Sequence, residues 1–404
     1  MKIAIMMRAM DQDSGFCTVT QGMIRSMLKL EPTISYLLMY KTRKWFGQFA
    51  DYPNAKEVLM EVSSKLLWDQ VAVPYTAWKE RADVLYNPKF SVPLISPCPV
   101  TMGLQEPAWF TRPEEYEKWD CRYQKLMIPL SIRKCAHVFP NSTFILVENR
   151  RVLRMPIMHA TVTYSGFDPR FRPVDNPSVL DQFRRKYQLP EKFILVLSRV
   201  KHMGVRTGDF YPGKRPEIAY RAYMRIREEV QHQLVFAGDH IRDYLLDTEG
   251  KEADFSGVKF LQFIPFEELH LLYNLADICV NPCEYEGCPN TVLQAMACGC
   301  PMIVAAQGGS ADVAEGAALM AKPLDSVDLS EKLLAIICNE GLRSDLRTKS
   351  INRANFFGWE KSAKATIDAL RGVVDRRTVK PMDEDRACLH GTTPFHPRFK
   401  LHHR

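Results

Sequence analysis

Residues 286–301 read EGCPNTVLQAMACGCP, the stretch of this sequence with the clearest local structure. Glu286 and a glycine come first, Pro289 follows, and an apolar segment then runs to Gly299, with a proline two residues later. Proline favours the start of a helix and glycine its end. The stretch therefore predicts a short helix that begins near Asn290, with a carboxylate just ahead of it.

Segments typical of buried strands and of helices alternate on both sides of this stretch. The predicted strands are residues 2–8, 34–40, 83–88, 99–105, 137–142, 160–166, 192–199, 233–239, 258–263, 277–283 and 302–306. The predicted helices are residues 16–30, 64–82, 114–135, 215–230, 266–276, 290–298 and 328–338. Such alternation indicates parallel sheets with helices on both faces, an α/β fold.

The chain is long enough for two domains. Its 404 residues exceed one ordinary core and suit two units of ~150–200 residues each. Three prolines within residues 169–177 stand in a polar context and indicate a connection. We expect one domain at 1–168 and a second at 185–357. From 374 to 404 the sequence is polar, without periodicity, and holds four of the ten histidines. We interpret it as a loosely draped tail, rather than an arm that binds metal or nucleic acid.

Charge and targeting signals narrow the class of protein. The net charge of +7 suggests partners that carry phosphate, or an anionic membrane surface, without choosing between them. The apolar run of about five residues in MKIAIMMRAM is too short for a secretion signal, and no run approaches the ~18 residues of a membrane span. Eleven cysteines without such a signal indicate a reducing cytosol. We expect a cytoplasmic protein, with peripheral association at the inner face of the membrane as an open alternative.

Five cysteines are concentrated near the opening stretch. They are Cys279, Cys283, Cys288, Cys298 and Cys300. A metal site or a disulfide is one interpretation, but none of them has the C-x-x-C spacing, and Cys279 lies in the strand-like run DICVNPC. Buried free cysteine behaves as a small hydrophobe, and we prefer that interpretation.

Four segments of the chain carry the motifs of a known family, residues 164–173, 286–301, 308–325 and 355–363. Through these segments the chain resembles the retaining GT-B glycosyltransferases of family 4. Glu286 and Gly287 begin an E-x7-E motif, and AMACGCP matches its continuation. GGSADV is similar to the family's G-G-x-x-E loop, with Asp312 at the acidic position, and NFFGWEKSA is similar to its F-x-W-E helix. The likeness covers about residues 1–372 and is most specific over 275–325.

This resemblance implies a fold and a reaction. It implies two Rossmann-like domains that face a deep cleft, with a C-terminal helix at about 358–373 crossing back to the first domain. Members move a hexosyl unit from a UDP- or GDP-sugar to a hydroxyl of a saccharide, lipid-linked or small-molecule acceptor, with retention of configuration. The nucleotide sugar is a co-substrate, and neither a metal nor another cofactor is expected.

The resemblance also assigns catalytic residues. Glu286 would bind the donor sugar and support the charge that develops at its anomeric carbon. Arg199 and Lys214 would clamp the leaving diphosphate, because cations stabilise the charge that builds there. They stand fifteen residues apart, farther than in the family, because residues 200–213 are expanded. The expanded segment could form a lid or contact the acceptor. The alternative is a plain surface loop. It leaves Lys201, Arg206 and Arg215 as rivals to Lys214.

The predicted donor-binding residues come from both domains. The helix that starts at Asn290 or Thr291 would direct its dipole at the phosphates, and Gly15 would meet them from the first domain. Gly308 and Gly309 could let backbone approach the ligand. The remaining predicted donor contacts are Gly238, Asp239, Phe263 and Ile264 near the base, with Gly287, Cys288 and Pro289 in the motif.

Two departures from the family pattern bear on activity. Gln294 replaces the second glutamate of the motif, which removes a charge-assisted contact to the ribose. Gln105 and Glu106 stand where the family often has a His-Asp or His-Gly pair, and we assign them to the acceptor together with Trp109. For Glu106, the outer hydroxyls of the donor are the alternative. Core packing is the alternative role for Trp109 and for its aromatic neighbours.

Three other classes of protein stay open. Gln294 and the missing histidine suggest a non-catalytic homologue that only binds nucleotide sugars. A sugar-nucleotide epimerase would have the same architecture. The net positive charge alone would suit a protein that binds nucleic acid, but no sequence motif supports this class, and we expect no nucleic acid partner.

Overall fold

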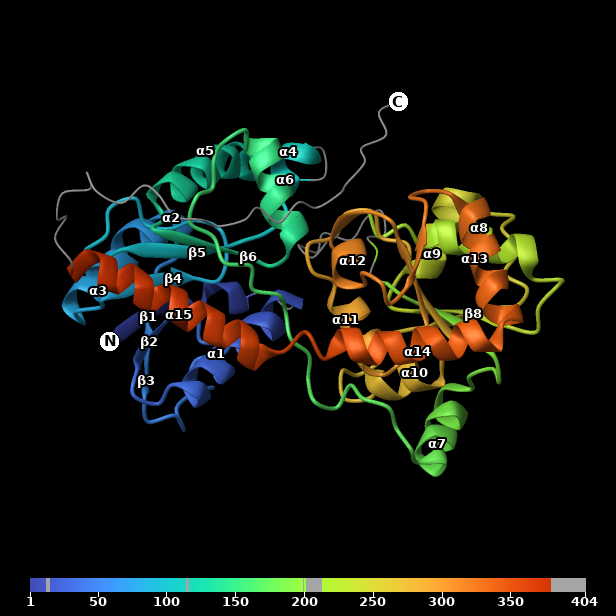
Figure 1. Cartoon of the computed structure of the whole chain (residues 1–404). Coiled ribbons are helices and arrows are strands. Elements are labelled where there is room, and N and C mark those ends of the chain that lie inside the picture. Colours follow the sequence, from blue (N-terminus) through green and yellow to red (C-terminus); the bar gives the residue numbers. More distant parts are fainter. Residues whose placement is uncertain (12–14, 114–115, 199, 201–212, 379–404) are drawn as a thin grey trace, which may run out of the picture.

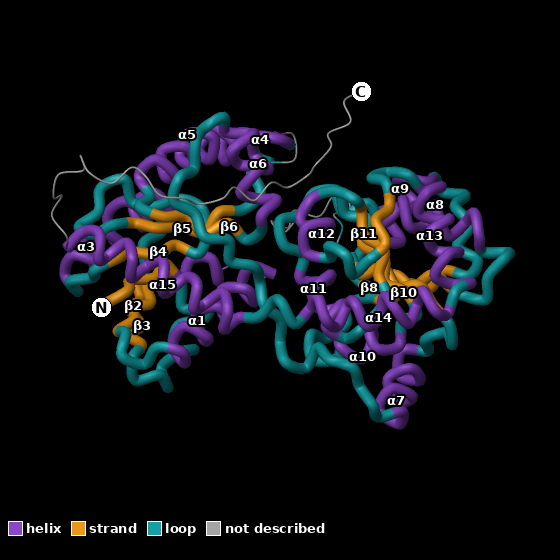
Figure 2. Tube along the Cα trace, in the orientation of Figure 1, coloured by secondary structure: helices purple, strands orange, loops and turns teal. Residues whose placement is uncertain are grey.

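The computed structural model describes residues 1–404 except 12–14, 114–115, 199, 201–212 and 379–404. Two α/β domains lie side by side (Figure 1). Each is built on a parallel sheet of six strands, ordered β3-β2-β1-β4-β5-β6 in the first domain and β12-β11-β10-β7-β8-β9 in the second. Figure 2 shows the two sheets at the centres of their domains with helices around them. The expected fold class is confirmed.

The first domain places helices on both faces of its sheet. The strands are β1 (Lys2–Met6), β2 (Ser35–Tyr40), β3 (Ala55–Leu59), β4 (Val84–Asn87), β5 (Val100–Leu104) and β6 (His137–Pro140). The helices are a 3-10 turn η1 (Met7–Asp11), α1 (Gly15–Leu30), α2 (Lys65–Leu67), a π turn η2 (Trp68–Ala72), α3 (Val73–Lys79), α4 (Ala108–Thr111), α5 (Lys118–Lys134) and α6 (Thr143–Leu153). Helix α1 packs on one face, and α3 and α5 share a core on the other.

The second domain repeats this plan. Its strands are β7 (Phe193–Leu197), β8 (Gln233–Ala237), β9 (Val258–Leu261), β10 (Ile278–Asn281), β11 (Met302–Ala305) and β12 (Leu319–Ala321). Its helices are α7 (Pro177–Tyr187), α8 (Pro216–Ile226), α9 (Ile241–Glu249), α10 (Leu269–Leu275), α11 (Asn290–Ala297), α12 (Gly308–Val313), α13 (Ser326–Cys338) and α14 (Glu340–Ala354). Helices α10 and α11 pack on one face of the sheet, and α8 and α13 on the other.

The strand order locates the place where a ligand is expected. In the second sheet, β7, β8 and β9 run outward in sequence order, and β10 then returns to the other side of β7. The order reverses in the same way between β1 and β4. Open α/β sheets bind ligands outside the carboxyl ends of the strands at such a reversal. The loops after β7 and β10 therefore hold the best position for a site.

The last described helix, α15 (Trp359–Thr378), returns to the first domain. Ala363, Ile367 and Leu370 are buried in the core that α1 forms with the first sheet, and Figure 1 shows α15 running beside α1. A Cβ at Gly166 would lie 2.3 Å from the backbone nitrogen of Trp359, so the glycine permits this close crossing. The returning helix is confirmed, but it extends to Thr378, beyond the predicted end at 373. Val373 is buried and Val374 packs on the same core, which explains the extra length.

Other boundaries also differ from expectation. Residues 160–166, predicted as a strand, form only an isolated bridge between Val138 and Ala160 and then lead into the connection. The connection itself contains α7, because Asn176 accepts a hydrogen bond from the N–H of Val179 and Pro177 occupies the first turn. Among the described helices, none combines the length and apolar character that a membrane span requires.

We expect Leu370→Ala to lower the free energy of unfolding of the first domain by about 2–5 kcal/mol. Leu370 is fully buried where α15 covers the first sheet, so its truncation leaves a cavity between them. The measurement is urea unfolding followed by circular dichroism. Lys364→Ala, which removes only an exposed ion pair with Asp368, serves as the control and should change stability by no more than about 0.5 kcal/mol. Equal stability of the two variants would contradict the docking of α15.

Candidate active site

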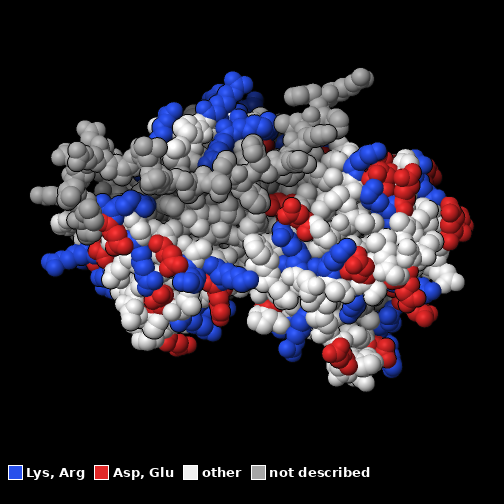
Figure 3. Space-filling view, viewed as in Figure 1, with Lys and Arg blue, Asp and Glu red and all other residues white. Residues whose placement is uncertain are grey.

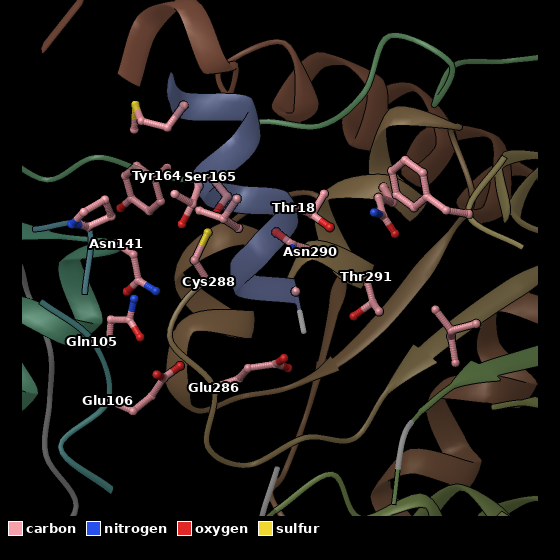
Figure 4. A pocket seen from close by; sticks show the side chains of 18 of the residues that line it. Thr18, Gln105, Glu106, Asn141, Tyr164, Ser165, Glu286, Cys288, Asn290 and Thr291 are labelled. Atoms are coloured by element: carbon pink, nitrogen blue, oxygen red, sulfur yellow. The ribbon is translucent and has the colours of Figure 1, made fainter. Parts of the chain in front are cut away.

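A cavity of about 330 Å³ lies between the two domains. Its lining comes from the carboxyl ends of strands in both sheets, where the strand order predicts a ligand. Figure 4 shows Gln105, Glu106 and Asn141 on the side of the first domain, and Asn290 and Thr291 on the side of the second. The linker and the first residue of α15 complete the wall.

An ion pair joins the two expected catalytic side chains in this cavity. Lys214 Nζ lies 2.6 Å from Glu286 Oε1, and the two side chains are only 14% and 13% exposed. Lys214 precedes α8, and Glu286 lies in the loop between β10 and α11. Because buried charges require a partner, each of the two groups makes the burial of the other tolerable.

Lys214 is held in its charged form. Burial has the largest single effect and lowers the pKa of its ammonium, but Glu286, Cys283 and Glu106 together raise it, Glu286 foremost, and the net pKa shift is upward. The second carboxylate oxygen, Glu286 Oε2, is buried and has no hydrogen-bond partner among the described residues. The pair therefore offers a bound ligand one cation and one unused acceptor.

The loop around Glu286 is fixed by its backbone. The N–H of Gly309 donates to the carbonyl oxygen of Glu286 at 2.7 Å. A Cβ at Gly309 would lie 1.8 Å from the carbonyl oxygen of Gly287, so only glycine allows this approach. The expectation that Gly308 and Gly309 bring backbone to a ligand is corrected. Neither residue lines the cavity, and they support the Glu286 loop instead.

Glu106 reaches the same loop from the other domain. Its Oε1 accepts a hydrogen bond from the N–H of Gly287 at 2.5 Å. A Cβ at Gly287 would lie 2.6 Å from that oxygen and 2.9 Å from the Asn141 side chain, which accounts for the glycine. Burial raises the pKa of the Glu106 carboxyl, although the N–H donors around it act in the opposite direction. Glu106 thus links the two domains one residue away from Glu286.

Two helices begin at the cavity from opposite domains. Gly15, the first residue of α1, and Asn290, the first residue of α11, both line it. They are close neighbours, because a Cβ at Gly15 would lie 3.3 Å from Asn290 Nδ2. Thr291 Oγ1 accepts a hydrogen bond from Asn281 at the end of β10. Helix N-termini favour anions, so the two starts together suit a phosphate group.

Gln294 is buried in α11 and also lines the cavity. Its Oε1 lies 3.4 Å from the hydroxyl of Tyr273, which donates to it. Burial raises the pKa of Tyr273 well above its ordinary value, so the hydroxyl keeps its proton. The glutamine carbonyl oxygen therefore has one hydrogen-bond donor, and its second lone pair and the amide N–H groups remain for a ligand.

The part of the cavity expected for the base is built from the ends of β8 and β9. Gly238, Asp239, Phe263 and Ile264 all line it, and their contact with the base stays a prediction. A Cβ at Gly238 would lie 1.8 Å from the carbonyl oxygen of Ser198, and the φ of +129° is one that glycine adopts freely. This glycine lets the loops after β7 and β8 pass each other closely.

The structure does not bring every predicted residue to the cavity. Arg199 lies outside the described residues, and so do Lys201 and Arg206, two of the rivals to Lys214. Trp109 does not line the cavity, and its assignment to the acceptor stays a prediction. Its Nε1–H donates to Asp120, and its ring packs against Phe90 and Tyr116 in the first domain. Core packing, the alternative stated for this ring, describes its position.

Two motif residues shape the site without lining it. Pro289 precedes α11 and accepts the backbone bonds of its first turn, and Gly287 binds Glu106. Cys288 lines the cavity, and burial raises the pKa of its thiol to about 12. In the part of the chain described, no three His, Cys, Asp or Glu side chains are grouped to hold a metal ion. The five cysteines of this region are free thiols, and all of them except Cys288 are buried.

Sequence reasoning missed several cavity residues of the first domain. They are Thr18, Asn141, Thr163, Tyr164, Ser165 and Trp359. Tyr164 also donates a hydrogen bond to Asp312 at 3.0 Å, which joins the linker to α12. The F-x-W-E segment and the linker were recognised only as fold markers. Their position beside the cavity depends on how α15 returns, which no local pattern reveals.

The two sheets, the cavity between them and the returning helix define a two-domain protein of the GT-B fold. HepE of Anabaena, solved in complex with UDP-glucose, has this fold, with a TM-score of 0.66 and 16% identity over 94% of this chain and 99% of that one. The family model of glycosyl transferases group 1 matches residues 202–339 of the second domain. Together with the relatives below, the match supports a group 1 glycosyltransferase, and the narrower assignment to family 4 stays a prediction.

Two curated relatives also indicate a glycosyltransferase. The chain is 24% identical to O-antigen chain mannosyltransferase B of Escherichia coli over 306 residues, which are 73% of this chain and 76% of that protein. It is 28% identical to D-inositol 3-phosphate glycosyltransferase of Kribbella flavida over 229 residues, 53% of this chain. In that second case the match spans about half of the relative, 54% of its length.

We expect Glu106→Gln to raise the free energy of unfolding at about pH 8 and to leave it unchanged near pH 4. Glutamine keeps an oxygen for the N–H of Gly287 and does not ionise. A carboxyl whose pKa is raised on folding stabilises the protein below its unfolded pKa and loses that contribution as the pH rises through the folded pKa. Chemical unfolding across this pH range measures the effect, with the exposed Glu331→Gln as control. Destabilisation by Glu106→Gln at pH 8 would show that the Glu106 charge is net favourable.

Proposed function

We propose that this protein is a retaining, metal-independent glycosyltransferase. It moves a hexosyl unit from a UDP- or GDP-sugar to a hydroxyl of a saccharide or lipid-linked acceptor. The observation that carries the proposal is the Lys214–Glu286 pair in the cavity, next to the starts of α1 and α11. One relative is named for mannose transfer in an O-antigen chain, so we propose polysaccharide biosynthesis as the process and mannose as the first sugar to test.

Unused acceptors in the cavity support a ligand rich in hydroxyl groups. Asn141 Oδ1, Glu286 Oε2 and Asn290 Oδ1 are buried, and the structure gives them no partner among the described residues. All three residues line the cavity. Because a buried polar atom without a partner is costly, a sugar whose hydroxyls donate to these oxygens is favoured there.

Lys214 and the helix starts suit the leaving group. Departure of a diphosphate builds negative charge, which an ammonium and oriented N–H groups stabilise in a cavity that excludes water. The raised pKa of Lys214 keeps its ammonium available at neutral pH. When Lys214 binds a phosphate oxygen, Glu286 Oε1 becomes free to accept a sugar hydroxyl. In the bound state, Lys214 would thus contact the diphosphate of the donor, and Glu286 would contact its sugar.

Retention follows in this proposal from attack on the face that the diphosphate leaves. The acceptor oxygen forms its bond to the anomeric carbon as the bond to the phosphate oxygen breaks. That phosphate oxygen takes the acceptor proton, so no side-chain nucleophile is needed. Glu286 supports the positive charge on the sugar ring during the step. Asn141 and Gln105 lie on the first-domain side of the cavity (Figure 4), where the acceptor is placed in this proposal.

Incubation of the pure protein with a panel of nucleotide sugars and saccharide acceptors tests the reaction. Release of UDP or GDP together with an α- or β-linked product of retained configuration supports the proposal. Conversion of the sugar without release of diphosphate would indicate an epimerase. Nucleotide binding without either reaction would indicate the non-catalytic homologue that Gln294 keeps open.

We expect Glu286→Ala to lower kcat by at least about a hundredfold while nucleotide affinity changes by less than about tenfold. The carboxylate is placed at the sugar rather than at the base, so its loss acts on the transition state. Glu286→Gln, which keeps the shape, should show the same split. Steady-state kinetics and calorimetric titration with UDP and GDP give the two numbers. Glu315→Ala, an exposed carboxylate in the same domain, is the control. Wild-type turnover in Glu286→Ala would place the reacting centre elsewhere.

We expect Gln294→Glu to tighten UDP or GDP binding by about fivefold, because a carboxylate accepts ribose hydroxyls more strongly than an amide does. Turnover should change little, since Gln294 lies one helix turn beyond the start of α11. Calorimetric titration and steady-state kinetics on the same preparation measure the nucleotide affinity and the turnover. The Tyr273 hydroxyl already donates to the Gln294 side chain, and it would offset part of the cost of burying the new carboxylate. Weaker nucleotide binding in Gln294→Glu would mean that the amide donates to the ligand.

A further inference from the structure

An arginine of the first domain reaches the loop that carries Glu286. Arg112 follows α4, and its side chain is only 16% exposed. Its guanidinium forms an ion pair with the carboxylate of Glu284, a side chain that is 12% exposed and lies two residues before Glu286. This contact crosses the domain boundary, because Glu284 belongs to the loop between β10 and α11.

Tyr285, the next residue of the loop, also contacts the first domain. The guanidinium of Arg112 lies 5.2 Å from the centre of the Tyr285 ring, a cation–π arrangement. The same ring stands edge-on to Phe144, with 5.9 Å between the ring centres, and its hydroxyl donates to Glu148 Oε1 at 3.4 Å. Phe144 and Glu148 both lie on α6 of the first domain.

The first domain therefore holds the loop on both sides of Glu286. The two residues ahead of it are bound by Arg112 and α6, and the N–H of Gly287 after it donates to Glu106. Glu286 lines the cavity, whereas Arg112 and Glu284 do not. Arg112 would thus act on a ligand through the loop, and not by contact.

The same arginine lies against the segment that carries Lys214. A Cβ at Gly213 would lie 2.6 Å from Arg112 Nη1, at a φ of +83° that favours glycine. The carbonyl oxygen of Gly213 accepts the N–H of Glu284 at 3.0 Å, and Arg215 Nη2 donates to Glu284 Oε1 at 3.1 Å. Arg112 therefore contacts sequence neighbours of both members of the Lys214–Glu286 pair.

Burial separates this contact from ordinary charge pairs of the surface. Figure 3 shows basic and acidic side chains interspersed over the visible face of both domains. A half-exposed pair such as Arg221 with Glu249 is screened by water and contributes little. The carboxylate of Glu284 is almost enclosed, and one of its oxygens is shared by a guanidinium from each domain, Arg112 and Arg215. Charge-assisted bonds from two sides fix its position.

We propose that Arg112 is a positioning residue for the Lys214–Glu286 pair, so that the first domain completes the site. In the proposed glycosyl transfer, on which this inference rests, Lys214 moves to the diphosphate and Glu286 loses its ion-pair partner. The contacts of Arg112 with Glu284 and Tyr285 involve neither charge of that pair. They persist in the bound state and keep the Glu286 carboxylate at the sugar. A displacement of about 1 Å at such a group is enough to slow a reaction about a hundredfold.

Two kinds of measurement on the full-length protein test the proposal, and one of them needs no reaction. Hydrogen–deuterium exchange of the amides of residues 284–287 reports whether the loop is held. Steady-state kinetics with GDP-mannose or UDP-glucose and calorimetric titration with GDP or UDP report turnover and nucleotide affinity. The variants are Arg112→Ala, Arg112→Lys, Glu284→Gln and the double variant Arg112→Ala/Glu284→Gln. Arg221→Ala, which removes an arginine–carboxylate pair inside the second domain, is the matched control.

We expect Arg112→Ala to speed amide exchange in residues 284–287 by about tenfold or more, because the loop loses its anchor to the first domain. It should lower kcat by about tenfold or more and change the Kd for UDP or GDP by less than about threefold. Arg112→Lys, which keeps the charge, should recover part of both losses. The losses of the two single variants should not multiply in the double variant, since both act through one contact.

Thermal melts show whether each variant is folded, and we expect Arg112→Ala to fold because Arg215 still pairs with Glu284. Wild-type turnover in Arg112→Ala, unchanged exchange in residues 284–287 or an equal loss in Arg221→Ala would overturn the proposal. It would also be overturned if nucleotide affinity fell as much as kcat. If the wild type turns over neither nucleotide sugar while Arg112→Ala still speeds exchange, the proposed transfer fails and the positioning of the loop stands.

Discussion

The ion pair between Lys214 and Glu286 is the contact on which the site depends. The two charges lie 2.6 Å apart and are almost enclosed by protein. Neither charge would be stable there alone, because an unpaired buried charge costs several kcal/mol, roughly 3–5 when one partner is removed. The pair ties the residues ahead of α8 to the loop after β10, on either side of the point where the strand order reverses. The charges that a donor would use thus also hold the loops around it together.

Close contacts of the backbone connect the Glu286 loop to both domains. The Glu286 loop receives the N–H of Gly309 from its own domain, and it gives the N–H of Gly287 to Glu106 of the other. Both glycines stand where a Cβ would collide with a neighbour. Asp312 adds a second link, because it accepts hydrogen bonds from the N–H of Phe144 and from Tyr164. The cavity is therefore shaped by contacts between domains, and not by the second domain alone.

Much of the fold was predictable because the evidence for it is local. Most strands of both sheets are short apolar runs, and α11 is marked by Pro289 and Gly299, so composition and turn residues suffice for them. The edge strands β3 and β12 were not predicted, and β3, with the sequence AKEVL, is not an apolar run. The prediction of residues 160–166 as a strand was wrong, because these residues form the linker beside the cavity and pair with the sheet only at Ala160. Trp109 was placed at the acceptor because it follows Glu106 closely. Its partner Asp120 lies eleven residues away, and no sequence pattern connects the two.

The sequence by itself determined the two α/β domains, the helix at Asn290 with Glu286 ahead of it, and the departure at Gln294. These follow from residue types and from spacings of a few residues, which set local backbone structure. Only the tertiary structure decided that Lys214, seventy-two residues before Glu286, is its partner, and that Glu106 and Asn141 reach the same loop. Those relations depend on which sheet edges meet and on how α15 returns, and both result from packing across the whole chain.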